Sequence, residues 1–131
     1  MNNHPKLPQP TESELEILHI LWEHGPNTVR FVNDKLNDQQ KKEIGYTTTL
    51  KLMQIMAADK KLLSRNTESR THIYKAEAKQ TDTQKALLKK FVDATFRGSA
   101  MNLVMQALGN HETSETELAE IKALIEQIEK K

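Results

Sequence analysis

The 131-residue chain has no cysteine, few aromatic residues and no long apolar run. The lack of cysteine excludes disulfides, thiolate metal sites and cysteine nucleophiles. No apolar stretch reaches the roughly 18 residues that a membrane span requires. Residues 1–10 contain three prolines and no apolar core of the kind found in signal peptides. We therefore expect a soluble protein of the cytoplasm, with residues 1–10 as a flexible N-terminal lead.

Signatures of catalysis are also missing. The chain has no glycine-rich phosphate loop, no His-Glu-x-x-His motif and no Gly-x-Ser-x-Gly motif. Among the five histidines, His19 lies one helical turn from Glu23, but two ligands do not complete a metal site. We expect neither an enzyme nor a bound metal or cofactor.

The formal net charge of +1 conceals an uneven distribution. Residues 41–75 carry 8 basic and 3 acidic side chains, whereas residues 1–40 and 111–131 are each net acidic. A surface that faces phosphates needs positive charge gathered in one region. The basic segment 41–75 is therefore the candidate for such a surface.

The basic segment contains a helix-like stretch followed by a hairpin-like one. In residues 46–59, apolar side chains recur at spacings of 3 and 4, with hydroxyls and a lysine between them, which predicts a helix. Residues 62–75 alternate in polarity about a polar turn at 67–69, with Arg65 on one arm and Arg70 on the other. A helix followed by a basic hairpin is the layout of a winged helix-turn-helix, so the sequence points to nucleic acid.

Two further helices are predicted before this segment. Thr11 and Glu14 form a capping box that starts a helix with a broad apolar face, and Gly25 ends it. Trp22 lies on that apolar face, so we assign it to the core. Thr28 caps a second, short helix, and residues 27–28 offer a minor third strand. Residues 11–76 thus make a mainly α winged-helix domain with a small β-hairpin wing.

Three more helices are predicted after a linker at residues 77–80. They begin at the caps Thr81, Ser99 and Ser114. Three helices in about 50 residues cannot bury such apolar stripes against one another. We therefore predict that residues 81–131 form a dimerisation region that pairs with a second copy of the chain. The residues assigned to this contact, which include a heptad-like seam on the last helix, are Leu88, Phe91, Val92, Leu103, Val104, Leu108, Leu118, Ile121, Ile125 and Ile128.

Eight side chains are candidates for contact with DNA. A threonine can bond to a base edge or touch a thymine methyl, lysine can reach guanine or phosphate, and arginine suits phosphates and narrow grooves. The alternatives are a polar helix cap for the first group and a solvated edge strand for the second. Tyr46 has the further alternative of packing against the second helix. The candidates are Tyr46, Thr47, Thr48, Thr49 and Lys51 on the helix, and Arg65, Arg70 and His72 on the hairpin.

Three motifs in this order resemble the BlaI/MecI penicillinase-repressor family over nearly the whole chain. They are Thr11-x-Ser13-Glu14-Leu15-Glu16-Ile17-Leu18-x-x-Leu21-Trp22, Gly45-Tyr46-Thr47-Thr48-Thr49 and Arg70-Thr71-His72-Ile73-Tyr74. The resemblance implies a homodimeric winged-helix repressor that binds a palindromic double-stranded DNA operator, often of β-lactam-resistance or stress genes.

The resemblance also implies how repression is relieved. A membrane-bound zinc metalloprotease receptor signals, and the repressor is cut within its dimerisation region. The aligned bond here is Gln106-Ala107, where better-known members have Asn-Phe. A second departure is Lys60-Lys61, where relatives tend to have Lys-Gly, so we expect the turn into the hairpin to form differently. The C-terminal cysteines of the copper-responsive branch are absent.

Two other functions compete with the repressor. A winged helix can dock a partner protein without binding DNA sequence-specifically, since fold does not fix function. Such a face would expose apolar or aromatic anchors in place of Lys51, Arg65 and Arg70. A regulator with a small-molecule pocket between the dimerisation helices is the third reading, although no residues single out such a pocket.

Overall fold

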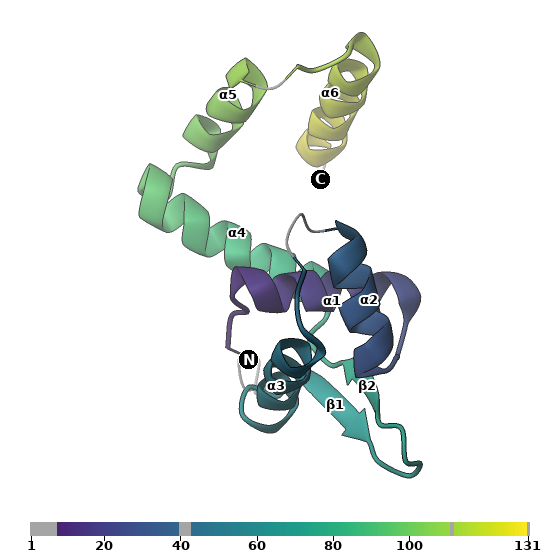
Figure 1. The fold of residues 1–131 in the computed structure, drawn as a ribbon. Helices are drawn as coiled ribbons and strands as arrows, with labels where there is room; N and C mark the ends of the chain where they lie inside the picture. Colours follow the sequence, from purple (N-terminus) through teal and green to yellow (C-terminus); the bar gives the residue numbers. More distant parts are fainter. Residues whose placement is uncertain (1–7, 40–42, 111, 131) are drawn as a thin grey trace. The chain divides into compact units, whose positions relative to one another are not determined.

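The computed structural model describes residues 8–39, 43–110 and 112–130, which form six helices and a two-stranded antiparallel sheet (Figure 1). The prediction of a mainly α chain with a small hairpin is confirmed. The chain divides into two compact units, an N-terminal unit that ends at Leu87 and a C-terminal unit that starts at Leu88. All elements of the winged helix belong to the N-terminal unit.

The first helix, α1 (Glu12–His24), has the predicted ends. The Thr11 hydroxyl accepts a hydrogen bond from the Glu14 amide at 3.2 Å, and the Glu14 carboxylate accepts one from the Thr11 amide at 2.9 Å. Gly25 ends the helix with a φ of 81°, a conformation that side chains other than glycine rarely adopt. The capping box and the glycine stop are therefore confirmed.

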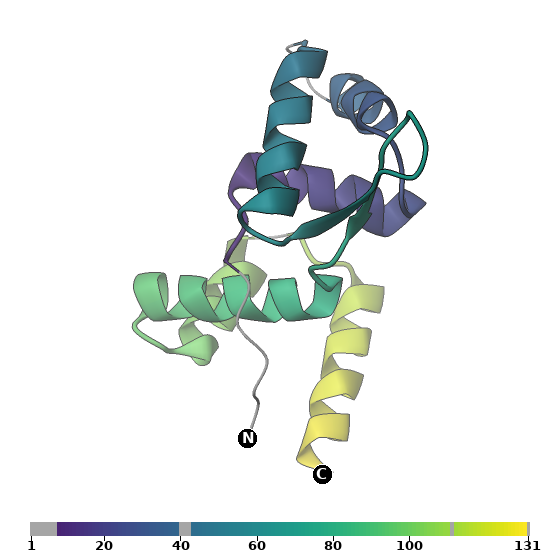
Figure 2. The ribbon, with the colours of Figure 1, turned by 90° about the horizontal axis from the view of Figure 1, so that it is seen from below.

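Helices α2 (Val29–Gln39) and α3 (Tyr46–Ala58) complete the helical part of the winged helix. The Thr28 hydroxyl caps α2 by accepting from the Phe31 amide at 3.1 Å. Figure 2 shows α3 lying across α1, and apolar side chains from all three helices meet in one core. The buried members from these helices are Ile17, Leu18, Ile20, Leu21, Val29, Val32, Leu36, Met53 and Met56.

The hairpin consists of β1 (Leu63–Asn66) and β2 (Ile73–Ala76), which pair antiparallel with Arg65 opposite Tyr74. Asn27 joins the hairpin as an isolated bridge: its amide donates to the Tyr74 carbonyl at 2.9 Å and its carbonyl accepts from the Tyr74 amide at 2.8 Å. The minor third strand predicted before α2 is thus reduced to a single bridge. It anchors the start of α2 to the hairpin.

The segment predicted as a linker at 77–80 is tied to the winged helix. The amides of Glu77 and Ala78 both donate to the Leu62 carbonyl, at 2.8 and 3.1 Å. The Trp22 indole donates to the Ala78 carbonyl at 2.8 Å, and Ala78 is buried. Trp22 packs against the core, as predicted, and also fixes the chain that leaves the hairpin.

Helix α4 (Gln80–Phe96) begins slightly before the predicted cap at Thr81. The Thr83 amide donates to the Lys79 carbonyl at 2.9 Å, so helical hydrogen bonding has already started when the chain reaches Thr81. The two compact units divide at Leu87, inside this helix.

A buried ion pair joins the start of α1 to the end of α3. The Lys60 ammonium lies 2.7 and 2.8 Å from the two Glu14 carboxylate oxygens, and the Glu14 side chain is only 3% exposed. Burial opposes ionisation of Glu14, but the hydrogen bonds from Lys60 and from the Thr11 amide outweigh it and lower the pKa of Glu14. The capping carboxylate therefore also holds the C-terminal end of α3.

The turn from α3 into β1 contains a lysine with left-handed backbone geometry. Lys61 has a φ of 59°, in the region that glycine adopts without steric cost. The turn was expected to form differently because Lys61 stands where relatives tend to have glycine. The lysine instead takes a conformation that favours glycine, and a side chain there costs roughly 1–2 kcal/mol.

Replacing Lys61 with glycine should therefore stabilise the protein. We expect the free energy of unfolding to rise by about 0.5–1 kcal/mol, because relief of the left-handed strain is partly offset by the larger entropy of glycine in the unfolded chain. Urea denaturation measures the change. Lys61→Ala is the control, since alanine loses the same charge but keeps a Cβ. A Lys61→Gly protein no more stable than Lys61→Ala would contradict this account of the turn.

Candidate nucleic-acid interface and C-terminal contact surface

Helix α3 has one face in the core and one face exposed. Met53 and Met56 are fully buried on the inner side. Thr47, Thr48 and Lys51 are exposed on the outer side. Helix α3 has no side-chain cap at Gly45 and no acidic residue in its first turn. The exposed face thus carries hydroxyls and a cation beside the positive end of a helix dipole, which suits an anionic partner.

The structure removes Thr49 from the candidate contacts to DNA. Its side chain is fully buried, and its hydroxyl accepts a hydrogen bond of 2.8 Å from the Asn33 side-chain amide of α2. Thr49 belongs to the inner side of the helix because it lies one turn before Met53, so it shares the face that packs on α2. It therefore positions α3 and cannot reach a base from this site.

Two asparagines of α2 hold the chain just before α3. The Asn33 amide donates to the Ile44 carbonyl as well as to Thr49. Asn37 donates to the same carbonyl at 3.0 Å and accepts from the Ile44 amide at 2.5 Å. Both backbone groups of Ile44 are thus satisfied by side chains of α2. Side-chain hydrogen bonds of this kind fix the entry of α3, and neither asparagine was assigned a role from the sequence.

Tyr46 packs against α2 and also remains accessible. The Arg30 guanidinium lies over its ring, 4.5 Å from the ring centroid, and Tyr46 is 39% exposed. The two roles considered for Tyr46, packing and access to DNA, are therefore compatible. Arg30 was missed by the sequence reasoning because it lies outside the basic segment, on the preceding helix. The feature of the sequence that could have identified Arg30 is its position two residues after the Thr28 cap.

The wing exposes all three of its predicted basic residues. Arg65 lies on β1, as predicted. Arg70 and His72 do not lie on a strand: the predicted second arm starts at Arg70, but β2 starts at Ile73, so both belong to a loop spanning residues 67–72. Local hydrogen bonds replace strand pairing here: the Glu68 amide donates to the Asn66 side chain at the end of β1, and the Ser69 hydroxyl donates to the Thr71 carbonyl within the loop. The wing tip is therefore wider than a tight polar turn.

The C-terminal unit contains the end of α4 together with α5 (Ala100–Asn110) and α6 (Glu115–Glu129). The Ser99 hydroxyl accepts from the Asn102 amide and the Ser114 hydroxyl accepts from the Glu117 amide, each at 3.1 Å, so both predicted serine caps are present.

This unit exposes apolar side chains over all three helices. Helix α6 has no buried residue. Of the ten residues assigned to dimer contact, Leu103 and Ile121 are half-buried and Val92 is 8% exposed, so Val92 is already covered within the single chain. The other seven are exposed: Leu88, Phe91, Val104, Leu108, Leu118, Ile125 and Ile128.

Three further apolar side chains join the exposed surface without having been assigned to it. Met101 and Met105 are exposed on α5, and Leu124 is exposed on α6. Together with Val104 and Leu108, the two methionines follow the i, i+3, i+4, i+7 spacing of a helical stripe. That spacing was the signal that could have identified them.

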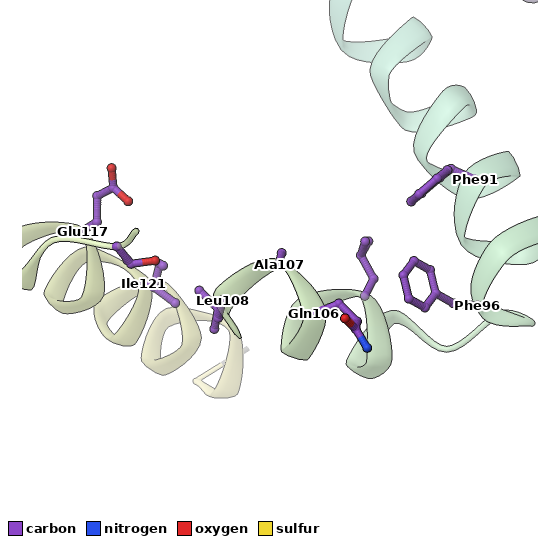
Figure 3. Close-up of a pocket in the computed structure, with 9 residues that line it drawn as sticks. Phe91, Phe96, Gln106, Ala107, Leu108, Glu117 and Ile121 are labelled. Carbon is purple, nitrogen blue, oxygen red and sulfur yellow. The ribbon is translucent and has the colours of Figure 1, made fainter. Parts of the chain in front are cut away.

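A hollow of about 500 Å³ lies among these helices. Figure 3 shows Phe91 and Phe96 beside it from α4, Ala107 and Leu108 from α5, and Ile121 from α6. The lining is mainly apolar. The Gln106-Ala107 bond lies inside α5, so its backbone is helical.

Across the described ranges, no three His, Asp or Glu side chains form a group that could hold a metal ion. In the same ranges, no helix is long and apolar enough to cross a membrane.

Comparison with known proteins agrees with this geometry. The profile of the penicillinase repressor family matches residues 10–127. The penicillinase repressor of Bacillus licheniformis is 24% identical over 123 residues, which cover 93% of both chains. The match spans the winged helix and the apolar C-terminal helices together. The chain therefore belongs to the penicillinase repressor family.

Proposed function

We propose that this chain is a DNA-binding transcriptional repressor that acts as a homodimer on a palindromic operator. The observation that carries the proposal is the outer face of α3. Thr47, Thr48 and Lys51 are exposed there, next to a helix start that has no side-chain cap and no acidic residue in its first turn. The family match over residues 10–127 supports the same reading.

The chemistry of this face fits the major groove of DNA. An α-helix fits into the groove, threonine can meet a base edge or a thymine methyl, and lysine can reach guanine or a phosphate. Arg65, Arg70 and His72 on the wing lie in the part of a winged helix that meets the backbone or minor groove. Binding through these cations should weaken steeply with salt, because each phosphate contact releases counterions.

The C-terminal helices supply the argument for a dimer. They expose a set of apolar side chains much larger than an isolated small domain normally leaves in water. A second copy of the chain would cover these side chains, and its own helices would fill the hollow beside Phe91 and Ile121. Two recognition helices related by two-fold symmetry require half-sites about one helical turn of DNA apart, or a multiple of that distance.

Relief of repression by proteolysis is part of the proposal. A membrane-bound metalloprotease sensor is the partner that the family resemblance implies, and Gln106-Ala107 is the aligned bond. Because this bond lies within α5, a protease would need the helix to open locally before it could cut. A signal that loosens α5 would therefore promote both cleavage and loss of the dimer.

The protein-docking alternative receives less support. A docking face usually presents apolar or aromatic anchors at its centre. The outer face of α3 presents Thr47, Thr48 and Lys51, and its aromatic residue, Tyr46, is covered on one side by Arg30. These side chains suit DNA better than a protein partner.

The test of this function is the effect of Thr48→Ala and Lys51→Ala on DNA binding. If these residues read bases, each change should cost roughly 1–3 kcal/mol on the promoter of the protein's own gene and little on scrambled DNA. Fluorescence anisotropy on both duplexes measures the difference. Lys122→Ala, which removes one positive charge from α6, is the control and should leave both affinities unchanged.

Two outcomes would contradict parts of this proposal. Equal losses on promoter and scrambled DNA would mean that Thr48 and Lys51 only position the protein and do not read bases. A wild-type protein that binds both duplexes equally and weakly at physiological salt would overturn the repressor and favour the protein-docking module.

A further inference from the structure

Arg30 occupies an unusual position beside the recognition helix. It lies in the first turn of α2, is exposed, and has its guanidinium over the ring of Tyr46, the first residue of α3, at 4.5 Å from the ring centroid. Thr47 and Thr48, which follow Tyr46 directly, belong to the exposed face of α3. A charged group from a different helix is thus held at the edge of that face.

The guanidinium over the Tyr46 ring keeps its hydrogen-bonding capacity. The cation–π contact is electrostatic and takes up no hydrogen-bond acceptor, so the five N–H donors of the group can still bind a partner. Among residues 8–39, 43–110 and 112–130, no carboxylate lies within 4.0 Å of Arg30, and Asp34, one turn along α2, makes no ion pair with it. The cation is therefore oriented by an aromatic ring and is not neutralised by an acid.

We propose that Arg30, oriented by Tyr46, is a preorganised contact to a DNA phosphate beside the recognition helix; this inference rests on the proposed function. In a helix-turn-helix the second helix enters the major groove and the first crosses the phosphate backbone, and here α2 is that first helix. Arginine matches the geometry of phosphate with two parallel hydrogen bonds. Holding the side chain in place beforehand reduces the entropy lost when it binds.

Tyr46 has two separable parts in this arrangement. Its ring holds the guanidinium, and its hydroxyl can donate to the same phosphate or to its neighbour. Tyr46→Phe removes only the hydroxyl, whereas Tyr46→Leu also removes the ring. The two substitutions therefore test the ring and the hydroxyl of Tyr46 separately.

The chain offers a matched control on the same helix. The Lys35 ammonium lies 5.6 Å from the Phe31 ring centroid, which makes a second cation–aromatic pair on α2. The Phe31 ring in turn meets the ring of His24 at the end of α1, with centroids 5.3 Å apart. Lys35→Ala thus removes the same charge from α2 at a site that faces α1 and not the start of α3.

The experiment measures affinity for promoter and scrambled DNA by fluorescence anisotropy over a series of salt concentrations. Arg30→Ala should weaken binding about tenfold on both duplexes and reduce the slope of log K against log salt by about 1 for each protomer bound. Arg30→Lys should restore the slope, because it keeps the charge, but only part of the affinity, because it lacks the planar fork. Lys35→Ala should leave the slope unchanged.

The dependence on the ring is tested with a double-mutant cycle. If the ring orients Arg30, Tyr46→Leu should weaken binding in the wild-type background and have a much smaller effect in the Arg30→Ala background. Tyr46→Phe should keep most of the coupling to Arg30. Thermal melting of each variant checks that the N-terminal unit stays folded, which we expect because both side chains are exposed.

Three results would overturn the inference. An unchanged affinity and slope for Arg30→Ala would show that this residue does not touch DNA, while wild-type selectivity would leave the repressor function standing. A loss confined to the promoter would assign Arg30 to bases and not to phosphate. Failure of the wild-type protein to bind either duplex would overturn the proposed function, and the inference with it.

Discussion

In the proposed dimeric repressor, replacing Ile125 and Ile128 with aspartate is expected to give a monomer that no longer binds operator DNA. Both side chains are exposed in the single chain, at 49% and 63%, and α6 buries no residue of its own. The two carboxylates would therefore be solvated in a monomer. In a paired seam they would be buried without partners, which costs several kcal/mol for each ion. Because an operator with two half-sites needs two linked heads, loss of the dimer should remove tight binding.

Light scattering measures the mass of this variant, and anisotropy measures its affinity. Ile121 lies on the same seam, but it is half-buried and lines the hollow, so Ile128 is the cleaner choice for a double substitution with Ile125. Ala123→Asp with Gln127→Asp adds the same two charges to the opposite side of α6 and should preserve the dimer. A dimer that survives the seam substitutions would place the contact elsewhere.

Replacing Lys60 with methionine should destabilise the winged helix by about 2–3 kcal/mol near neutral pH. The change leaves the Glu14 carboxylate buried at 3% exposure without its cation. The figure is below the 3–5 kcal/mol of a fully buried pair because Lys60 itself is 29% exposed. Since the pair joins α1 to the end of α3, part of the loss should appear as weaker DNA binding.

The pH dependence of this effect has a definite sign. In the wild type the pKa of Glu14 is lowered, because the hydrogen bonds from Lys60 and Thr11 outweigh the effect of burial. The stability contributed by ionised Glu14 is therefore complete above its unfolded-state pKa and is lost as pH falls through the folded-state pKa. Without Lys60, burial should raise the pKa of Glu14, so the protonated carboxyl can form at mildly acidic pH. The difference in the free energy of unfolding between Lys60→Met and the wild type should therefore shrink as pH falls from about 7 to about 4.

Urea denaturation at several pH values tests both claims. Lys89→Met is the matched control, because Lys89 also contacts a carboxylate, Asp93 at 2.8 Å, but both side chains are well exposed. Exposed ion pairs contribute little to stability, so this variant should unfold like the wild type. Equal behaviour of Lys60→Met and Lys89→Met would show that the Glu14 pair does not stabilise the fold.

Much of the fold could be predicted from local patterns. The caps at Thr11, Thr28, Ser99 and Ser114 depend on side chains that bond to amides three residues away, so the sequence alone locates them. The glycine stop after α1 is local in the same way. Alternation predicts the hairpin, but with too short a loop, because hydrogen bonds within residues 66–72 compete with strand pairing.

The errors and omissions in the candidate site arose where distant segments meet. Thr49 was counted with its neighbours because it is a hydroxyl in a row of hydroxyls, yet the contact with Asn33 shows that it faces α2. Arg30 was missed because its relation to Tyr46 joins two helices. The linker at 77–80 looked free in the sequence, but Leu62 and Trp22 bind its backbone.

The sequence by itself determined the order of the elements, the basic winged-helix segment and the apolar C-terminal helices, because periodicity, capping and charge distribution act over a few residues. Only the tertiary structure decided which hydroxyl of α3 faces inward, which arginine stands beside the recognition helix, and that the Glu14 capping carboxylate also binds Lys60. These outcomes depend on the rotation of one helix against another. That rotation is set by packing among residues far apart in the chain, which no local pattern encodes.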